Sequence, residues 1–237
     1  MPFFRLISIA LQGVRKAQLQ LGHSVAVLGQ GIIGNLAGQI ARQAGATCVV
    51  GIDPVAWRRE LALQCGMDAA LDPASPSFAD SWGELTEKRG FDAVFEASGV
   101  PDAVNEALAL AARLGRVVLL GSTRGVTERV NFYRDVHKKG LTIIGAHESA
   151  RAVGEDIGGY CTHRTDGRTA LLLLAARRLT VQPLLSLELA ASEGPAAYAL
   201  LRSKQERLMT IALDWRVAKQ DEHRPELSQR LQRHPAN

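Results

Sequence analysis

The fold of this chain is predicted by the run Ser24-Val-Ala-Val-Leu28 and by Gly29-Gln-Gly-Ile-Ile-Gly34, which follows it directly. The first five residues are a short apolar run of the kind that is buried on both faces of a parallel sheet. The next six have the spacing G-x-G-x-x-G, and a helical pattern then runs from about Ile32 to Ala44 until Gly45 stops it. A strand, a glycine turn and a helix in this order predict the first unit of a doubly wound sheet.

The glycine turn has the pattern of a cradle for the phosphates of a dinucleotide. Gly29 permits the tight turn, Gly31 lets the backbone approach a pyrophosphate, and Gly34 lets the helix pack closely on the sheet. The helix start, including Ile32 and Ile33, offers unpaired N–H groups and a partial positive charge to the phosphates. The alternative is a glycine turn that serves the fold alone.

An acidic residue, Asp53, closes the second predicted strand (47–52) about twenty positions after the turn. A carboxylate there accepts hydrogen bonds from the adenosine ribose hydroxyls and repels a 2′-phosphate. The sequence therefore favours NAD over NADP as the cofactor. Arg58 and Arg59 weaken this preference, because either guanidinium could pair with a phosphate.

Strand and helix patterns continue to alternate along the chain, which predicts a parallel sheet covered on both faces. Pro101 opens a helix that we expect to end at Leu114–Gly115, because proline is accommodated in the first turn of a helix. We expect a leading helix at about 4–20, helices within 54–66 and between 72 and 92, and further strands at 69–71, 93–95, 116–120 and 141–144. The predicted fold is α/β, a doubly wound, six-stranded parallel sheet of the Rossmann type over residues 1–150.

The alternation weakens beyond residue 150. The sequence predicts a helix near 168–178, an extended segment at 181–185, a helix around 194–202 and a strand at 208–213. We interpret residues 151–217 as part of a second lobe and residues 218–237 as a disordered tail.

Composition bounds the function classes. The 237 residues are 46% hydrophobic and 22% charged with a net charge of +4, which is typical of a globular domain. Basic residues of the polar tail are interpreted as a solvated end rather than a nucleic-acid grip. No apolar run approaches the roughly 20 residues that cross a bilayer. The three cysteines, Cys48, Cys65 and Cys161, are too few and too scattered for a disulfide framework, so we expect a cytoplasmic protein. From the polar tail and the short apolar runs we expect no nucleic-acid or membrane partner.

Several motifs taken together resemble the zinc-containing medium-chain dehydrogenase/reductase superfamily, of the alcohol, sorbitol and threonine dehydrogenase type. The stretches that carry the resemblance are 22–34 with Asp53 and Arg58, Asp92-Ala-Val-Phe-Glu-Ala-Ser-Gly99, Gly115-Arg-Val-Val-Leu-Leu-Gly121, 141–145, 193–201 and 208–213. The resemblance implies an NAD-dependent oxidoreductase that moves a hydride between an alcohol or polyol carbon and the nicotinamide.

The resemblance also implies that two loops flank the nicotinamide end of the cofactor. These are Ala97-Ser98-Gly99 after the fourth strand and Gly121-Ser122-Thr123 after the fifth. Ligands in open α/β sheets bind beyond the carboxyl ends of the strands, which agrees with this placement. The alternative for Ser98 and Ser122 is an ordinary loop hydroxyl with a satisfied hydrogen bond.

Zinc is expected for the family, but its ligands are absent from this sequence. There is no Gly-His-Glu stretch and no cysteine cluster with zinc spacing. Cys161-Thr-His163 is the one close Cys/His pair, and we interpret it as a loop rather than a metal site. His147, after the sixth strand, is the best-placed candidate for proton transfer, although a partly exposed histidine bonded to the backbone is the favoured interpretation. The catalytic residues are therefore not assigned.

Three functional hypotheses remain open on the sequence. The resemblance implies that an N-terminal lobe, which in that family supplies the zinc ligands and the substrate pocket, is lacking here. The chain is the cofactor-binding portion of an alcohol or polyol dehydrogenase, a non-catalytic NAD-binding module such as a sensor or an assembly partner, or a chain whose N-terminal lobe comes from another polypeptide. The resemblance also implies a homodimer formed by pairing of an exposed sheet edge at Leu141–Ile144.

Overall fold

The computed structural model describes residues 3–158, 160–203 and 207–216. These residues form two compact units, one over Phe3–Leu179 and one that begins at Thr180. The helix predicted near 168–178, which we expected to belong with residues 151–217, lies in the first unit. The expected disordered tail, 218–237, lies outside the described residues.

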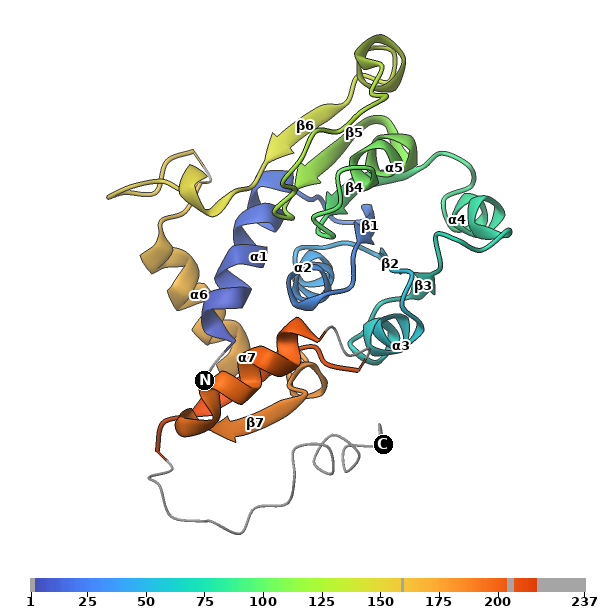
Figure 1. Cartoon of the computed structure of the whole chain (residues 1–237). Helices are drawn as coiled ribbons and strands as arrows, with labels where there is room; N and C mark the ends of the chain where they lie inside the picture. Colours follow the sequence, from blue (N-terminus) through green and yellow to red (C-terminus); the bar gives the residue numbers. More distant parts are fainter. Residues whose placement is uncertain (1–2, 159, 204–206, 217–237) are drawn as a thin grey trace. The chain divides into compact units, whose positions relative to one another are not determined.

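A parallel sheet of six strands forms the centre of the first unit (Figure 1). The strand order is β3-β2-β1-β4-β5-β6. The chain adds β2 and β3 on one side of β1 and then crosses to the other side of β1 to add β4, β5 and β6. The doubly wound α/β fold predicted from the sequence is confirmed. The strands are β1 (Ser24–Leu28), β2 (Cys48–Ile52), β3 (Ala69–Leu71), β4 (Phe91–Glu96), β5 (Ala111–Leu119) and β6 (Thr142–Gly145).

Helices cover both faces of this sheet. Residues Ala26, Val50 and Val94 of one face share a buried cluster with Leu108 of α5, and Trp82 of α4 packs against it. The other face meets α1 and α2, which also contact each other. The helices of this unit are α1 (Phe4–Ala17), α2 (Ile32–Gln43), α3 (Ala56–Gln64), α4 (Phe78–Leu85), α5 (Ala103–Leu110) and α6 (His163–Ala175).

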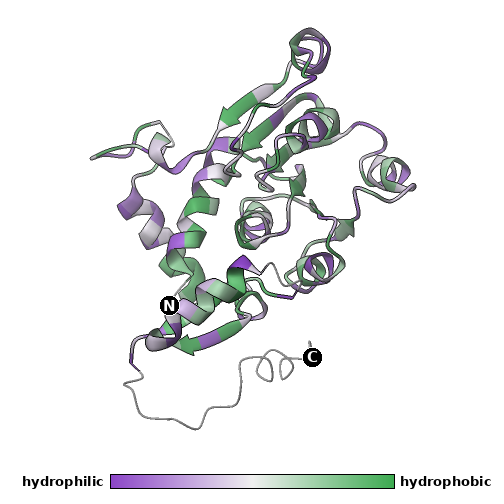
Figure 2. Ribbon diagram, viewed as in Figure 1, coloured by the Kyte–Doolittle hydropathy of each residue, from purple (hydrophilic) through white to green (hydrophobic). Residues whose placement is uncertain are grey.

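In the ribbon coloured by hydropathy, the strands of the sheet are mostly hydrophobic, whereas the helices carry both hydrophobic and hydrophilic residues (Figure 2). Val25, Val27, Phe91 and Phe95 are fully buried, as two-sided cover of a parallel sheet requires. Leu36 of α2 is equally buried. This core fixes the strand ends, and with them the loops at the carboxyl edge of the sheet. Among the described residues, no helix is both long and apolar enough to span a membrane.

The helix expected from Pro101 to Leu114 ends earlier than predicted. α5 stops at Leu110, and β5 begins at Ala111, which pairs with Phe91 of β4. A register shift follows, and Leu114 adopts a left-handed φ of +62°. Burial of Ala111 against β4 outweighs the local helical preference of residues 111–114, which the sequence pattern alone could not reveal.

Two other expectations between residues 160 and 185 are corrected. α6 begins at His163, five residues before the predicted start, because the Thr162 hydroxyl accepts a hydrogen bond from the Thr165 amide and caps the helix. The segment predicted as extended at 181–185 contains a short 3₁₀ turn, η3 (Gln182–Leu184), with Pro183 in its first turn. Proline restricts φ to a value that suits such a turn.

The second unit contains a small parallel pair of strands. Leu187 and Leu189 pack with Ala197 in its buried cluster. Strand β7 was not predicted, while α7 has the predicted bounds and β8 is shorter than expected. The helix and strands of the second unit are β7 (Leu187–Ala190), α7 (Gly194–Arg202) and β8 (Ile211–Asp214), and a short 3₁₀ turn, η4 (Ala191–Glu193), lies between β7 and α7. Short helical turns of the first unit are η1 (Phe132–His137, π type) and η2 (Glu148–Ala150, 3₁₀).

Candidate functional site

The glycine turn between β1 and α2 is too tightly packed for side chains at two of its three glycines. Gly29 has a φ of +86°, and a Cβ there would lie 2.7 Å from the Ser98 backbone. A Cβ on Gly34 would lie 1.9 Å from the Gly29 carbonyl oxygen. A Cβ on Gly31 would meet no atom within 4 Å, so the space above this residue is open. Gly31 is the N-cap of α2 and has no side chain that could accept hydrogen bonds from the first N–H groups of this helix.

Asp53, directly after β2, is held against this turn. Its Oδ2 accepts a hydrogen bond of 2.7 Å from the Gln30 amide, and its Oδ1 accepts one of 2.9 Å from the Val55 amide. The side chain is buried, with 3% of its surface exposed. A carboxylate oxygen can accept two hydrogen bonds, so Asp53 retains acceptor capacity beyond these two backbone contacts.

The two arginines that follow Asp53 differ in their contacts. Arg59 donates from Nη1 to the carbonyl oxygens of Asp53 and Pro54, each at 2.8 Å, and forms an ion pair of 3.1 Å with Asp72. Arg58 lies with its Nη1 3.7 Å from Asp53 Oδ2 and its guanidinium over the Trp57 ring. Both guanidinium groups are therefore already next to carboxylates.

The loops after β4 and β5 meet at a residue that the sequence analysis did not single out, Glu96. This last residue of β4 is fully buried, and its Oε1 accepts hydrogen bonds from the amides of Ser98 (2.8 Å) and Gly99 (3.0 Å). Its Oε2 accepts one of 3.0 Å from the Thr123 hydroxyl. The signal available in the sequence was an acidic residue that ends an apolar strand and precedes a small-residue loop.

Most predicted cofactor residues lie at one edge of the sheet. Ser98 lies against Gly29, and a Cβ on Gly121 would come within 2.7 Å of the Gly99 amide. The side chain of Ser98 turns inward, since its Oγ donates to Glu96 at 2.5 Å and accepts from the Val100 amide at 3.1 Å. Ser122 is exposed in the neighbouring loop. The structure thus joins the glycine turn to the two loops expected beside it.

His147, the histidine considered above for proton transfer, has hydrogen-bond partners close by, and His137 and His163 also have contacts. His147 is exposed, and its Nδ1 lies 2.8 Å from the Ser149 hydroxyl and accepts from the Ser149 amide at 3.2 Å. His137 stacks on Tyr133 with ring centroids 5.7 Å apart. His163 lies at the start of α6, with its Nδ1 3.3 Å from Glu148. None of these contacts connects a histidine to the glycine turn.

Cys161 and His163 contact different groups. The Cys161 Sγ accepts a hydrogen bond of 2.9 Å from Arg15 Nη1, whereas His163 contacts Arg5 and Glu148. In the part of the chain that the structure describes, no three His, Cys, Asp or Glu side chains gather in a way that would hold a metal ion. These residues therefore do not fit a catalytic zinc, which takes at least three protein ligands.

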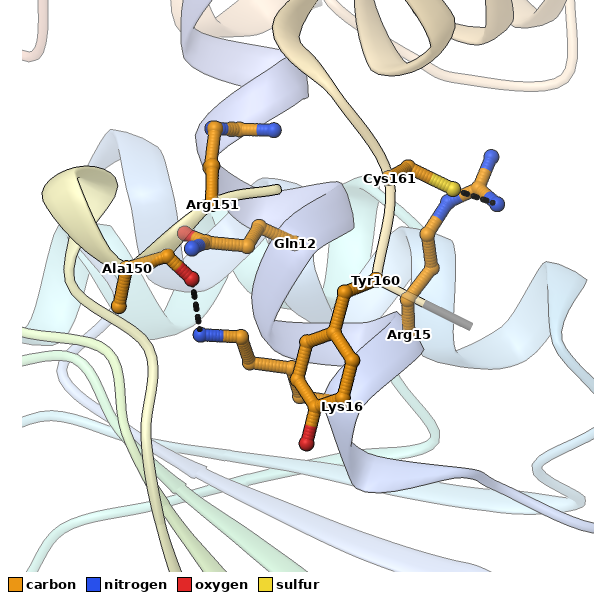
Figure 3. Close-up of a pocket in the computed structure, with 7 residues that line it drawn as sticks. All are labelled: Gln12, Arg15, Lys16, Ala150, Arg151, Tyr160 and Cys161. Carbon is orange, nitrogen blue, oxygen red and sulfur yellow. Dashed lines mark hydrogen bonds between the residues drawn. The ribbon is translucent and has the colours of Figure 1, made fainter. Parts of the chain in front are cut away.

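A pocket in the first unit lies between α1 and the segment 150–161, and none of the predicted cofactor residues lines it (Figure 3). Lys16 projects into this region and donates to the carbonyl oxygens of Gly145 and Ala150, each at 3.0 Å. Burial, aided by the charge of Arg151, lowers the pKa of Lys16. These contacts tie α1 to the chain after β6.

A buried ion cluster reinforces the same connection. Asp166, at the start of α6, pairs with Arg151, and its Oδ1 lies 3.0 Å from Arg15 Nε. The side chains of Asp166 and Arg151 are 1% and 2% exposed. Burial raises the pKa of Asp166, and the two arginines oppose this effect. The cluster has the character of a structural tether between α1, the segment after β6, and α6.

The comparisons with known proteins agree with this geometry. The family model described as zinc-binding dehydrogenase matches residues 33–157. The chain is similar to D-guloside 3-dehydrogenase of Escherichia coli (strain K12), with 36% identity over 135 residues that make up 57% of this chain and 39% of that protein. It is also similar to sorbitol dehydrogenase of Halalkalibacterium halodurans, with 27% identity over 80% of this chain and 52% of that protein.

A solved structure shares the fold. It is a zinc-binding dehydrogenase from Sinorhizobium meliloti 1021 bound to NADP, with a TM-score of 0.67 and 28% identity, covering 82% of this chain and 54% of that one. The sheet order and the glycine turn define a Rossmann protein of the nucleotide-binding type. More particularly, the chain belongs to the zinc-binding dehydrogenase family. It spans roughly half or less of the length of these relatives.

Proposed function

We propose that this chain holds NAD across the crevice between β1 and β4, with the pyrophosphate at the start of α2. The observation that carries the proposal is the hydrogen bond between Asp53 Oδ2 and the Gln30 amide, which holds an acceptor for the ribose hydroxyls beside the turn. The open space above Gly31 and the uncapped N–H groups of α2 fit a pyrophosphate. Doubly wound folds bind their ligands at the topological switch point, which in this sheet lies between β1 and β4.

The charges around Asp53 support NAD rather than NADP. A 2′-phosphate would lie close to a buried carboxylate, and like charges at short range repel. Arg59 is engaged by Asp72 and two carbonyl oxygens, so binding a phosphate would require those contacts to break. Arg58 lies beside Asp53 and would balance its charge rather than create a separate phosphate site.

The proposed activity is that of an alcohol or polyol dehydrogenase, in line with the relatives to which this chain is similar. The bound dinucleotide would supply the acceptor for a hydride, two electrons and one proton, from the carbinol carbon, and the hydroxyl proton would pass to a base. In this proposal the residues of this chain bind and orient the dinucleotide. We assign no residue of this chain as the group that accepts the hydroxyl proton.

Titration calorimetry with NAD and NADP tests the cofactor proposal. We expect saturable binding of NAD that is tighter than that of NADP. Asp53→Asn keeps the size of the side chain and removes its charge, so NAD binding should weaken about tenfold and the preference over NADP should shrink. Asp80→Asn, the same change on an exposed residue of α4, is the matched control and should bind as the wild type does. Tighter binding of NADP, or no binding by a folded chain, would overturn the proposal.

We also propose that two copies of the chain associate through β6. This strand pairs with β5 on one side and is the last strand in the sheet order. Ile143 on this strand is 39% exposed. An exposed edge strand with apolar side chains is a template for pairing with another strand.

A further inference from the structure

Glu96 is a buried carboxylate whose partners belong to two different loops. It has no exposed surface, and removing a carboxylate from water has a large free-energy cost unless hydrogen bonds compensate. Its Oε1 accepts from the Ser98 amide, the Ser98 hydroxyl and the Gly99 amide, all within the loop after β4. Hydrogen bonds to an ionised acceptor are stronger than those between neutral groups.

The other oxygen of Glu96 reaches the loop after β5. Oε2 accepts a hydrogen bond of 3.0 Å from the Thr123 hydroxyl, and a Cβ on Gly121 would lie 2.8 Å from the same oxygen. The Glu96 carbonyl oxygen also accepts from the amides of Leu120 and Gly121, at 2.9 and 2.7 Å. One residue therefore fixes the conformation of one loop and its distance from the next.

The loop after β4 lies next to the glycine turn, on the side away from Asp53, and the loop after β5 lies next to the loop after β4. In the strand order, β2 is on one side of β1, and β4 and β5 are on the other. The close approach of Gly29 to the Ser98 backbone places the loop after β4 against the turn. A dinucleotide with its adenosine at Asp53 and its pyrophosphate at the turn would bring its nicotinamide half to these loops.

We infer that Glu96 is a positioning residue, which holds the loops after β4 and β5 in the arrangement that receives the nicotinamide half of the cofactor. This inference rests on the proposed function. Glu96 lies beneath the loops and is fully buried, so it acts through Ser98, Gly99 and Thr123 rather than by touching the cofactor. The adenosine half, held by Asp53 on the other side of β1, should not depend on Glu96.

The test compares two ligands, NADH and ADP-ribose, which share the adenosine and the pyrophosphate but differ in the nicotinamide. Glu96→Gln preserves the shape of the side chain and removes its charge. Thr123→Val removes the hydroxyl that connects the two loops through Glu96 and nearly keeps the shape of the side chain. Thr123→Ser keeps a hydroxyl at this position and is the matched control. Affinities come from calorimetry, and the nicotinamide fluorescence of bound NADH reports its surroundings.

We expect Glu96→Gln to weaken NADH binding about tenfold, with ADP-ribose binding within about twofold of the wild type. Thr123→Val should act in the same direction and alter the fluorescence of bound NADH, whereas Thr123→Ser should resemble the wild type. If Glu96→Gln does not fold, the Thr123 pair carries the test.

Equal weakening of both ligands, or no weakening of either, would overturn the role of Glu96 while the cofactor proposal stands. If the folded wild type binds neither ligand, the cofactor proposal and the inference that rests on it both fail.

Discussion

Gly29 and Gly34 approach each other so closely that a Cβ on Gly34 would lie 1.9 Å from the Gly29 carbonyl oxygen. Gly34→Ala therefore forces the turn or helix α2 to move, and we expect a loss of about 3 kcal/mol or more in the free energy of unfolding. Urea denaturation followed by circular dichroism measures this loss. Unchanged stability of Gly34→Ala would show that the turn yields easily.

Gly31 gives the opposite prediction. A Cβ at this position would meet no atom within 4 Å, and its φ of −65° suits any residue. Gly31→Ala should therefore keep the wild-type stability, while the added methyl group obstructs the approach of a pyrophosphate to the backbone. We expect calorimetry to show NAD binding weakened at least about tenfold. Wild-type affinity in this variant would place the phosphates elsewhere.

The buried pair of Asp166 and Arg151, neither of which is a predicted cofactor residue, predicts a large effect on stability. Asp166→Ala leaves Arg151 buried without this partner, and breaking a buried ion pair costs about 3 kcal/mol. Glu155→Ala, at an exposed acidic residue, is the control and should have little effect. In the double variant Asp166→Leu with Arg151→Met, no charge of the pair stays buried, so urea denaturation should show part of the loss recovered. A double variant less stable than Asp166→Ala would contradict this account.

Cys65 predicts a pH dependence at alkaline pH. Burial raises the pKa of its thiol from the usual 9.0 to about 11, partly offset by a hydrogen bond with Asn35. The fold thus favours the neutral thiol, a contribution that is complete below pH 9 and is lost as the pH rises toward 11. Relative to Cys65→Ser, the wild type should lose about 1 kcal/mol of unfolding free energy between about pH 8 and pH 10. A constant difference between the two proteins would mean that this thiol does not titrate in that range.

The exposed strand β6 predicts how self-association responds to charge. Ile143→Lys places a cation at the sheet edge, which should convert a dimer to a monomer in sedimentation experiments. Leu172→Lys changes an exposed leucine of α6 in the same way and should leave the dimer intact. A wild type that is monomeric at all concentrations would refute pairing through β6.

Much of the first unit could be predicted because its signals are local. The β1 strand has the predicted bounds, since an unbroken apolar run next to a glycine turn has few alternatives. In the second unit, the α7 helix was predicted with the same bounds, because a proline in its first turn marks where it begins. The end of α5 at Leu110 was not predictable, because the pairing of Ala111 with Phe91 joins residues twenty positions apart.

Residue type at short spacing was enough to predict the doubly wound fold, the glycine turn and the acidic residue after β2. The contacts between distant residues became visible in the folded chain alone. The partnership of Glu96 with Thr123, and the burial of Asp166 between Arg15 and Arg151, depend on strands and helices that are far apart in the chain. Such contacts arise from the packing of the sheet and its helices, which brings distant residues together and leaves no periodic pattern in the sequence.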